Sequence, residues 1–378
     1  MALTIVATNF KGLQVNLIKS HSRLEGLNSL RGWAAVLIVV FHVLGIHNLK
    51  IPPEMAFIPR YFGLGVPLFF VISAFSLFLS TSSRVGKDGW LSEYAIRRIM
   101  RIAPLFYTIA IFYTIYIPLQ FGVTIKAVSF FGTLSFLFNL MPGQHESTIW
   151  AGWTIGVEML FYLIIPYLLV FSKNLVAAII ILIGALIVSS IFYKFYQNPI
   201  YPLGYAYMSF LGSIGIFTYG IVGYFIFKMS VSEAAKSNLG KVLLIASIVG
   251  AAGLVFAEDR WISYVGNRSN LWGAVFALLI VSQCWDPILL ITNRFASYLG
   301  TLSFGLYLCH PPIVYILKPV YEFFYAHISD GFAFALCVVT TLTIVVPTAH
   351  LASRYIEKPG INLGERLIKA RMAKDQSA

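Results

Sequence analysis

The sequence has few charged residues, which make up only 11% of its 378 positions, whereas hydrophobic residues make up 58%. Soluble domains contain roughly 25% charged and 45–50% apolar residues. Apolar stretches of roughly 18 residues or more recur along the whole chain, and such a stretch is long enough to cross a bilayer as a helix. These proportions exclude a soluble protein and predict an all-α integral membrane protein.

Cysteine is also scarce. Cys284, Cys309 and Cys337 all lie in apolar stretches, so their spacing excludes a disulfide framework and a CxxC metal pair, and we expect no metal. The first 28 residues lack the continuous apolar core and small-residue cleavage site of a signal peptide. We interpret 1–28 as a cytoplasmic or interfacial lead-in.

Acidic residues are outnumbered, with 15 Asp and Glu against 27 Lys and Arg, for a net charge of +12. In a soluble protein this excess would suggest a nucleic-acid partner. Here the basic residues gather in particular loops between apolar stretches, as in the cytoplasmic loops of membrane proteins. We therefore expect membrane lipids around the chain and no nucleic acid.

About ten apolar stretches are candidate transmembrane helices. They lie near 29–47, 61–80, 104–122, 150–171, 174–193, 203–227, 242–257, 270–285, 297–317 and 331–353. The stretch 127–141 is shorter than a comfortable crossing, so we interpret it as a re-entrant or interfacial helix on the outer side. No fixed-period repeat is visible. The sequence thus predicts one membrane domain over 29–359, followed by a cytoplasmic tail over 360–378 that is mobile after about Arg366.

The basic residues also predict an orientation. Ten crossings place both ends of the chain on one side. If that side is the cytoplasm, the inner segments carry 19 Lys and Arg and the outer segments carry seven, with Arg31 at a boundary. This bias follows the positive-inside rule. We expect a multi-pass protein with both termini cytoplasmic.

Ionisable groups within membrane helices are costly and need an explanation. Arg31 and His42 are eleven residues apart, so they share one face of the first helix, about 16 Å apart along its axis. Counting from the outer helix ends places Glu158 roughly 12 Å and His310 roughly 11 Å deep. We therefore expect Glu158, His310 and His42 to converge, with a general base among them.

Simpler interpretations exist for each of these groups. Arg31 fits a snorkelling anchor at a helix end, and His310 fits a hydrogen bond between helices. Arg98 and Arg101, in the predicted loop 81–103, are three residues apart and would face the same way on a helix, where they would bind phosphates. The alternative is positive-inside anchoring. We expect Glu357 and Lys358 to cap or pair locally.

Six segments in series resemble the membrane acyltransferase-3 family. They are LEGLNSLRGWAAVLIVVFHV (24–43), GVPLFFVISAF (65–75), RRIMRIAPLFY (97–107), WTIGVEMLFYLIIP (153–166), LGTLSFGLYLCHPPIV (299–314) and RYIEKP (354–359). The first contains the family's Arg, ten residues, His. One departure is Ala74, where the family commonly has Gly, and the extra methyl is expected to narrow a close contact between helices.

The resemblance implies transfer of an acyl group, usually acetyl, from cytoplasmic acyl-CoA to an extracytoplasmic acceptor. That acceptor would be a glycan or a lipid-linked sugar in a bacterial inner membrane. No permanently bound cofactor is implied. Some members carry a further hydrolase-like domain, whereas this chain ends about 20 residues after Pro359 and is expected to act alone or with a partner.

The resemblance also implies roles for single residues. His42 and Arg31 match the catalytic pair, and Glu158 is a further catalytic candidate that would orient His42 or bind the sugar. Arg98 and Arg101 match contacts to CoA phosphates. The substrate-site candidates match motif positions and are Ser73, Trp153, Tyr307 and His310. The competing class is a glycan or lipid transporter or flippase, because buried ionisable groups also mark transport paths.

Overall fold

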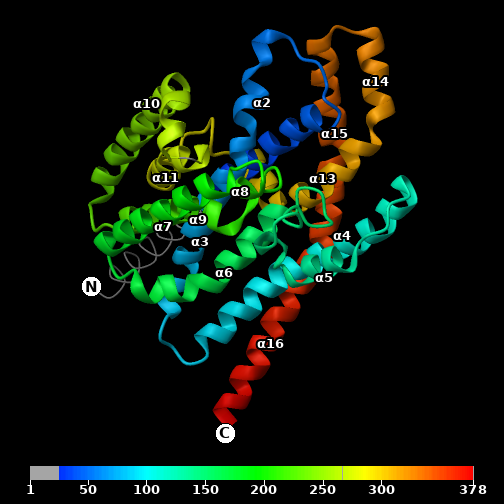
Figure 1. Cartoon of the computed structure of the whole chain (residues 1–378). Coiled ribbons are helices and arrows are strands. Elements are labelled where there is room, and N and C mark those ends of the chain that lie inside the picture. The colour runs from blue at the N-terminus through cyan, green and yellow to red at the C-terminus, as the bar shows by residue number, and fades with distance from the viewer. Residues whose placement is uncertain (1–24, 266, 378) are drawn as a thin grey trace, which may run out of the picture.

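The structure is a computed structural model that describes residues 25–265 and 267–377, and all regular structure in that part of the chain is helical (Figure 1). The first described helix, here the N-terminal helix, is Glu25–Ile46. The other α-helices are α2 (Phe57–Tyr61), α3 (Gly65–Thr81), α4 (Trp90–Phe121), α5 (Ala127–Ser135), α6 (Trp153–Phe171), α7 (Leu175–Tyr196), α8 (Tyr205–Met208), α9 (Phe210–Phe227), α10 (Glu233–Val265), α11 (Arg268–Trp285), α12 (Arg294–Thr301), α13 (Ser303–Ile316), α14 (Lys318–His327), α15 (Asp330–Ala352) and α16 (Lys358–Ser377). Short 3₁₀ turns are η1 (Pro53–Met55), η2 (Phe62–Leu64), η3 (Ser82–Arg84) and η4 (Phe138–Leu140), and η5 (Ser353–Glu357) is a π-helical turn.

The prediction of an all-α multi-pass membrane protein is confirmed. Within the described residues, eight helices are long and apolar enough to cross a bilayer, and α12 with α13 makes a ninth candidate that is bent by 74°. The tenth expected crossing, 270–285, is the helix α11. Its polar residues lower its apolarity, yet Asn270 and Gln283 are buried and hydrogen-bonded within the protein. Packing against other helices allows α11 to be more polar than a lipid-facing helix.

The segment 127–141 does not cross. It forms the nine-residue helix α5 and the turn η4, and nine residues of helix rise only about 14 Å, less than half the hydrocarbon thickness. Asn139 is fully buried and donates to the carbonyls of His145 and Met208. These contacts fix the segment beside α6 and α8, as expected for a re-entrant or interfacial piece.

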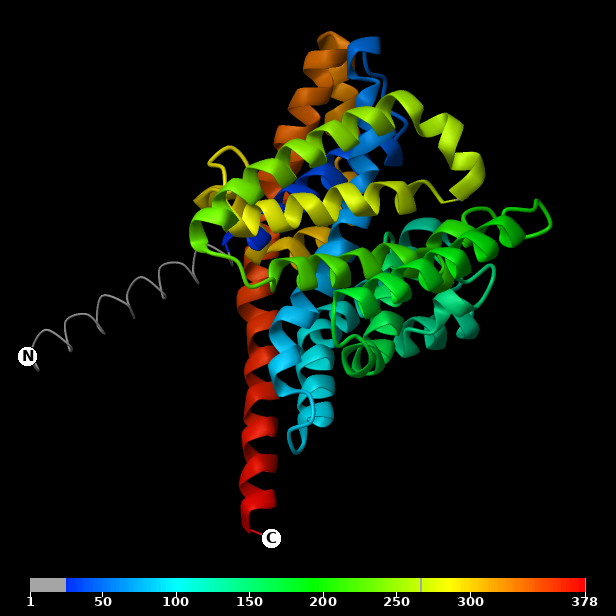
Figure 2. The ribbon, with the colours of Figure 1, turned by 90° about the vertical axis from the view of Figure 1, so that its left-hand side faces the viewer.

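Two boundaries differ from the sequence-based prediction. The expected loop 81–103 is short, because α4 begins at Trp90 and carries the arginine motif on its third and fourth turns. The tail 360–378, expected to be mobile after about Arg366, is helix α16 as far as Ser377, and it continues from α15 through η5. Figure 2 shows this long rod, with α16 projecting beyond the rest of the bundle. The lead-in is described only from residue 25 onward, so most of 1–28 lies outside the described residues.

The interior of the bundle is built on close contacts between helices. The N-terminal helix meets α12 at Gly32, where an added Cβ would lie 2.1 Å from the Ala296 carbonyl oxygen. Helix α3 packs on α9, and α9 packs on α7 and α11. Helices α7 and α10 lie at the periphery with most of their apolar side chains exposed, for example Ile183 and Ile245. This arrangement leaves the N-terminal helix, α3, α6 and α13 around a central site.

Candidate functional site

A cavity of about 110 Å³ lies among the N-terminal helix, α3, α4, α6 and α13. Six of the nine residues singled out in the sequence line it. They are Arg31, Ser73, Arg98, Arg101, Glu158 and Tyr307. The structure therefore brings together side chains from five helices that are far apart in the sequence. The other three candidates, His42, His310 and Trp153, do not line this cavity.

Three guanidinium groups converge on the cavity. Arg31 donates to the Ser76 hydroxyl at 2.8 Å and to the Asn28 side-chain oxygen at 3.3 Å. The Arg98 guanidinium lies 6.0 Å from the centre of the Tyr162 ring, within the range of a cation–π contact, and its Nε is buried without a hydrogen-bond partner. Such a concentration of donors suits a phosphate group, which guanidinium binds through two oxygens.

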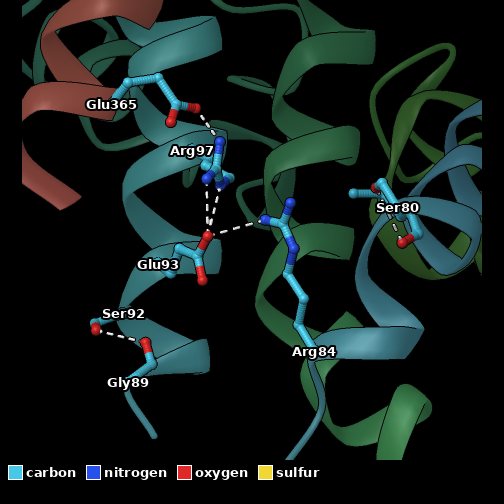
Figure 3. A network of polar contacts seen from close by, with 8 residues as sticks. Ser80, Arg84, Gly89, Ser92, Glu93, Arg97 and Glu365 are labelled. Carbon is cyan, nitrogen blue, oxygen red and sulfur yellow. Dashed lines mark hydrogen bonds and ion pairs between the residues drawn. The ribbon is translucent and has the colours of Figure 1, made fainter. Parts of the chain in front are cut away.

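The third arginine of the motif, Arg97, has a different setting. It donates to Glu93 one turn earlier on α4 and pairs with Glu365 on α16. Glu93 also accepts from Arg84 at 3.0 Å, so one carboxylate joins two arginines (Figure 3). Because these carboxylates compensate the charge of Arg97, it anchors α4 and α16, whereas Arg98 and Arg101 face the cavity.

Glu158 is fixed by two hydroxyls. Ser73 from α3 and Tyr162, one turn later on α6, each donate to its Oε1 at 2.5 Å. The Tyr94 hydroxyl on α4 donates to the backbone carbonyl of Tyr162 and ties the same turn to the arginine helix. The charge of Glu158 also acts on Arg31, so Glu158 is the anionic counterpart of the basic cluster.

His42 and His310 form a pair. Their Nδ1 and Nε2 atoms lie 2.9 Å apart, and His310 is fully buried. The Nδ1 of His310 faces the Leu306 carbonyl at 3.0 Å, so this nitrogen must carry the proton. The His310 Nε2 then accepts from the Nδ1 of His42. In neutral rings this order leaves the Nε2 of His42 unprotonated, with a lone pair free to accept a proton.

Tyr307 connects the cavity to the histidine pair. Its ring lines the cavity and lies 5.8 Å from the His310 ring, and its hydroxyl donates to the Ala151 carbonyl. The predicted convergence is confirmed for His42 and His310, which share a hydrogen bond. Neither hydrogen bond of the Glu158 carboxylate reaches His42, and Glu158 lies on the cavity beside the arginines.

Trp153 packs between the rings of Phe70 and Tyr207 and is 9% exposed, which is a packing role beside the cavity. Ser76 and Tyr162 were not predicted as site residues from the sequence. Each lies one helical turn from a residue that was, Ser73 and Glu158 respectively, so helical spacing was the available signal. In the described part of the chain, the three cysteines are buried, and no cluster of three metal-ligating side chains occurs.

Outside the membrane helices, the loop before α6 contacts the site at Ala151, whose carbonyl accepts from Tyr307. Burial lowers the pKa of His145 in this loop, so its ring stays neutral. The neutral ring accepts from the Gly143 backbone N–H and donates to the Leu203 carbonyl. These contacts join the loop before α6 to the loop before α8.

Comparison with known proteins decides the family. The family model of the acyltransferase domain, acyltransferase 3, matches residues 24–350. The chain belongs to this family. The match contains both histidines and all three arginines of the cavity, and it identifies the protein as a membrane acyltransferase rather than a transporter or flippase.

Two curated relatives are similar over nearly the whole chain. The putative peptidoglycan O-acetyltransferase YrhL of Bacillus subtilis is 24% identical over 384 residues, which cover 93% of this chain and 57% of the relative. The peptidoglycan O-acetyltransferase OatA of Listeria monocytogenes is 23% identical over 367 residues, which cover 90% of this chain and 56% of the relative. The chain thus spans little more than half the length of these relatives. No solved structure matches it significantly.

Proposed function

We propose that this acyltransferase moves an acetyl group from cytoplasmic acyl-CoA to a hydroxyl group of an extracytoplasmic glycan. The observation that carries the proposal is the continuous series of contacts from the arginines of α4, through the cavity and Tyr307, to the histidine pair. Arginines suit the donor's phosphates, and an imidazole with a free lone pair suits a base.

The donor would lie along the N-terminal helix. Its nucleotide phosphates would bind Arg98 and Arg101, with Arg31 beside them at the cavity. The pantetheine arm would follow the face that Arg31 shares with His42, which is about 16 Å long by helical rise. This arrangement brings the thioester to the histidine pair while the charged nucleotide stays at the basic end.

The acceptor hydroxyl would approach His42 from the opposite side of the membrane. The Nε2 of His42 would take the hydroxyl proton while the oxygen attacks the thioester carbonyl carbon. A C–O bond forms, the C–S bond breaks, and the CoA thiolate leaves and is protonated. A variant of this route has His42 first carry the acyl group on Nε2 and then pass it to the acceptor.

The relatives support a glycan acceptor, since both bear the name of peptidoglycan O-acetyltransferases. Mass spectra of cell-wall glycans from bacteria with and without the gene test this choice. We expect an acetyl increment that disappears with the gene and returns with the wild-type copy. Unchanged spectra of the cell-wall glycans would exclude them as acceptors.

The reaction itself is tested with purified protein in lipid vesicles and acetyl-CoA. We expect His42→Ala and Arg31→Ala each to lower the rate of CoA release about 100-fold or more, the usual contribution of a positioned base. His327→Ala is the matched control, because His327 is an exposed histidine on α14, away from the cavity. Full activity of either site variant, at normal folding and expression, contradicts the proposed mechanism.

A further inference from the structure

Glu357 occupies an unusual position for a carboxylate. It ends the π-helical turn η5 between α15 and α16, is 3% exposed, and its Oε1 has no hydrogen-bond partner in the described structure. The expectation that Glu357 pairs or caps locally is therefore wrong for this oxygen. Single π-helical turns are rare and frequently mark functional sites. Glu357 also lies beyond residues 24–350, which the family model matches.

A buried carboxylate is costly unless a cation compensates it. Burial acts most strongly against the charged form of Glu357, and the charges of Arg101 and, to a lesser extent, Lys358 favour it. Lys358 is the next residue of the helix and is exposed, so its side chain leaves the buried face. Arg101 lies on α4, against which the turn η5 packs, and no hydrogen bond or ion pair joins its side chain to Glu357 in the described structure.

The packing of α16 on α4 sets the distance between these groups. A Cβ on Gly360 would lie 2.6 Å from the Pro104 side chain, and one on Gly364 would lie 2.9 Å from the Met100 side chain. Two glycines four residues apart are the pattern that allows helices to approach closely. They hold the face of Glu357 and Ile361 against the turn of α4 that carries Arg101.

A second cavity lies along this contact between the helices. It measures about 130 Å³ and lies between α4 and α16, with Arg98 and Arg101 on one side and Ile361 and Gly364 on the other. Arg98 and Arg101 line the central cavity as well. The two cavities therefore share these arginines.

We propose that Glu357 is a positioning residue that holds the Arg101 guanidinium toward the phosphates of acyl-CoA, an inference that rests on the proposed function. Without an anion behind it, Arg101 would be repelled by Arg31 and Arg98, whose charges share the site. Glu158 compensates the cluster on the side of α6, and Glu357 compensates it on the side of α16. The tail helix thereby becomes part of the donor site without contacting the donor.

The test measures CoA affinity of the purified full-length protein in detergent micelles by calorimetry. We expect Glu357→Gln to weaken CoA binding about tenfold, which corresponds to about 1.4 kcal/mol. Affinity for acetyl-pantetheine, which lacks the nucleotide phosphates, is expected to stay at the wild-type value. A general disturbance of the cavity would weaken both ligands, so parallel losses overturn the proposal.

A double-mutant cycle tests whether Glu357 acts through Arg101. We expect the double variant of Arg101→Gln and Glu357→Gln to bind CoA as weakly as Arg101→Gln alone, because coupled residues are not additive. Glu365→Gln is the matched control on the same helix. Its partner Arg97 does not line the central cavity, and an exposed ion pair is worth little, so CoA affinity should change by less than about twofold.

The remaining outcomes are also decisive. Additive losses, or an unchanged affinity in Glu357→Gln, overturn the positioning role while leaving the proposed function intact. If Glu357→Gln does not fold, the same measurement is made on Glu357→Asp, because the shorter side chain moves the carboxylate away from Arg101. An unchanged CoA affinity in Glu357→Asp then overturns the positioning role. A wild-type protein that does not bind CoA overturns both this inference and the proposed donor.

Discussion

The histidine pair shows how single residues divide the work of the site. His42 is partly exposed and lies on the N-terminal helix, whereas His310 is fully buried on α13 and bonds to the Leu306 carbonyl. A buried ring with one nitrogen committed to a backbone carbonyl has a fixed orientation and a fixed tautomer. His310 is therefore suited to orient His42 rather than to react.

This division predicts the effect of His310→Ala. The substitution removes the hydrogen bond that fixes the Nδ1 proton of His42. We therefore expect kcat to fall about tenfold, because one hydrogen bond contributes about 1.4 kcal/mol and this free energy corresponds to a factor of ten. The KM for acetyl-CoA should stay unchanged, because the arginines that bind the donor are untouched. Steady-state kinetics in vesicles measures both constants. A raised KM with normal kcat would place His310 in donor binding instead.

Arg31 and His42 could be predicted from the sequence for two reasons. Ionisable side chains within an apolar helix are costly and mark functional sites, and residues eleven positions apart lie on the same face of a helix. The partners of Glu158, Ser73 and Tyr162, could not be predicted in this way, since depth was counted from helix ends as if every helix ran straight across the membrane. The structure contains a 74° bend between α12 and α13, and α4 has 32 residues. Tilt and bending are set by packing, which a single sequence does not encode locally.

At the level of elements, the contact between α3 and α9 explains how the protein accommodates Ala74. Ala74 stands where the family commonly has Gly, and it faces Gly220 on α9. A Cβ on Gly220 would lie 2.2 Å from the Val71 carbonyl oxygen and 2.9 Å from the Ala74 methyl. The missing side chain on α9 thus makes room for the methyl group on α3. The sequence analysis had predicted the crowding but not its partner.

Gly220→Ala is accordingly expected to destabilise the protein by about 1–3 kcal/mol, the usual cost of overpacking, because a backbone carbonyl has little freedom to move. The midpoint of thermal unfolding in detergent measures this loss. Gly184→Ala on α7 is the matched control, since no atom lies within 4 Å of its added Cβ. Replacing glycine by alanine in an open helix normally stabilises it. Equal midpoints for both variants would show that α3 and α9 are not in contact.

Helix ends were harder to predict than helix existence. Each of the ten expected crossings corresponds to a helix, because hydrophobic runs of this length have few alternatives in a bilayer. The first turns of α4 were taken for a loop, since arginines lower the local hydropathy. The charge of Arg97 is compensated by Glu93 and by Glu365 on α16, and the pairing with Glu365 is a tertiary contact. The same contact explains why the polar tail is a packed helix.

For the whole molecule, the mechanism depends on orientation. Acyl-CoA is made in the cytoplasm, so the end of the bundle with Arg98, Arg101 and α16 must face inward if the proposed function is correct. The loop 228–232 follows α9, whose Tyr224 bonds to Ser82 just before the arginine helix α4, and the loop 197–204 precedes α8 and α9. The excess of basic residues in the inner segments supports this orientation. The three native cysteines are buried, which leaves single introduced cysteines as clean reporters.

We expect Ile200→Cys to react with a membrane-impermeant maleimide on intact cells, and Met229→Cys and Met372→Cys to react only after the membrane is opened. All three side chains are exposed, at 83%, 47% and 56%, so access to the reagent and not burial decides the result. Ile200 and Met229 flank α9, so their opposite labelling would establish one crossing between them. Labelling of Met229→Cys on intact cells would place the arginines outside, away from acyl-CoA. The His42 and Arg31 pair would then be unable to draw its donor from the cytoplasm.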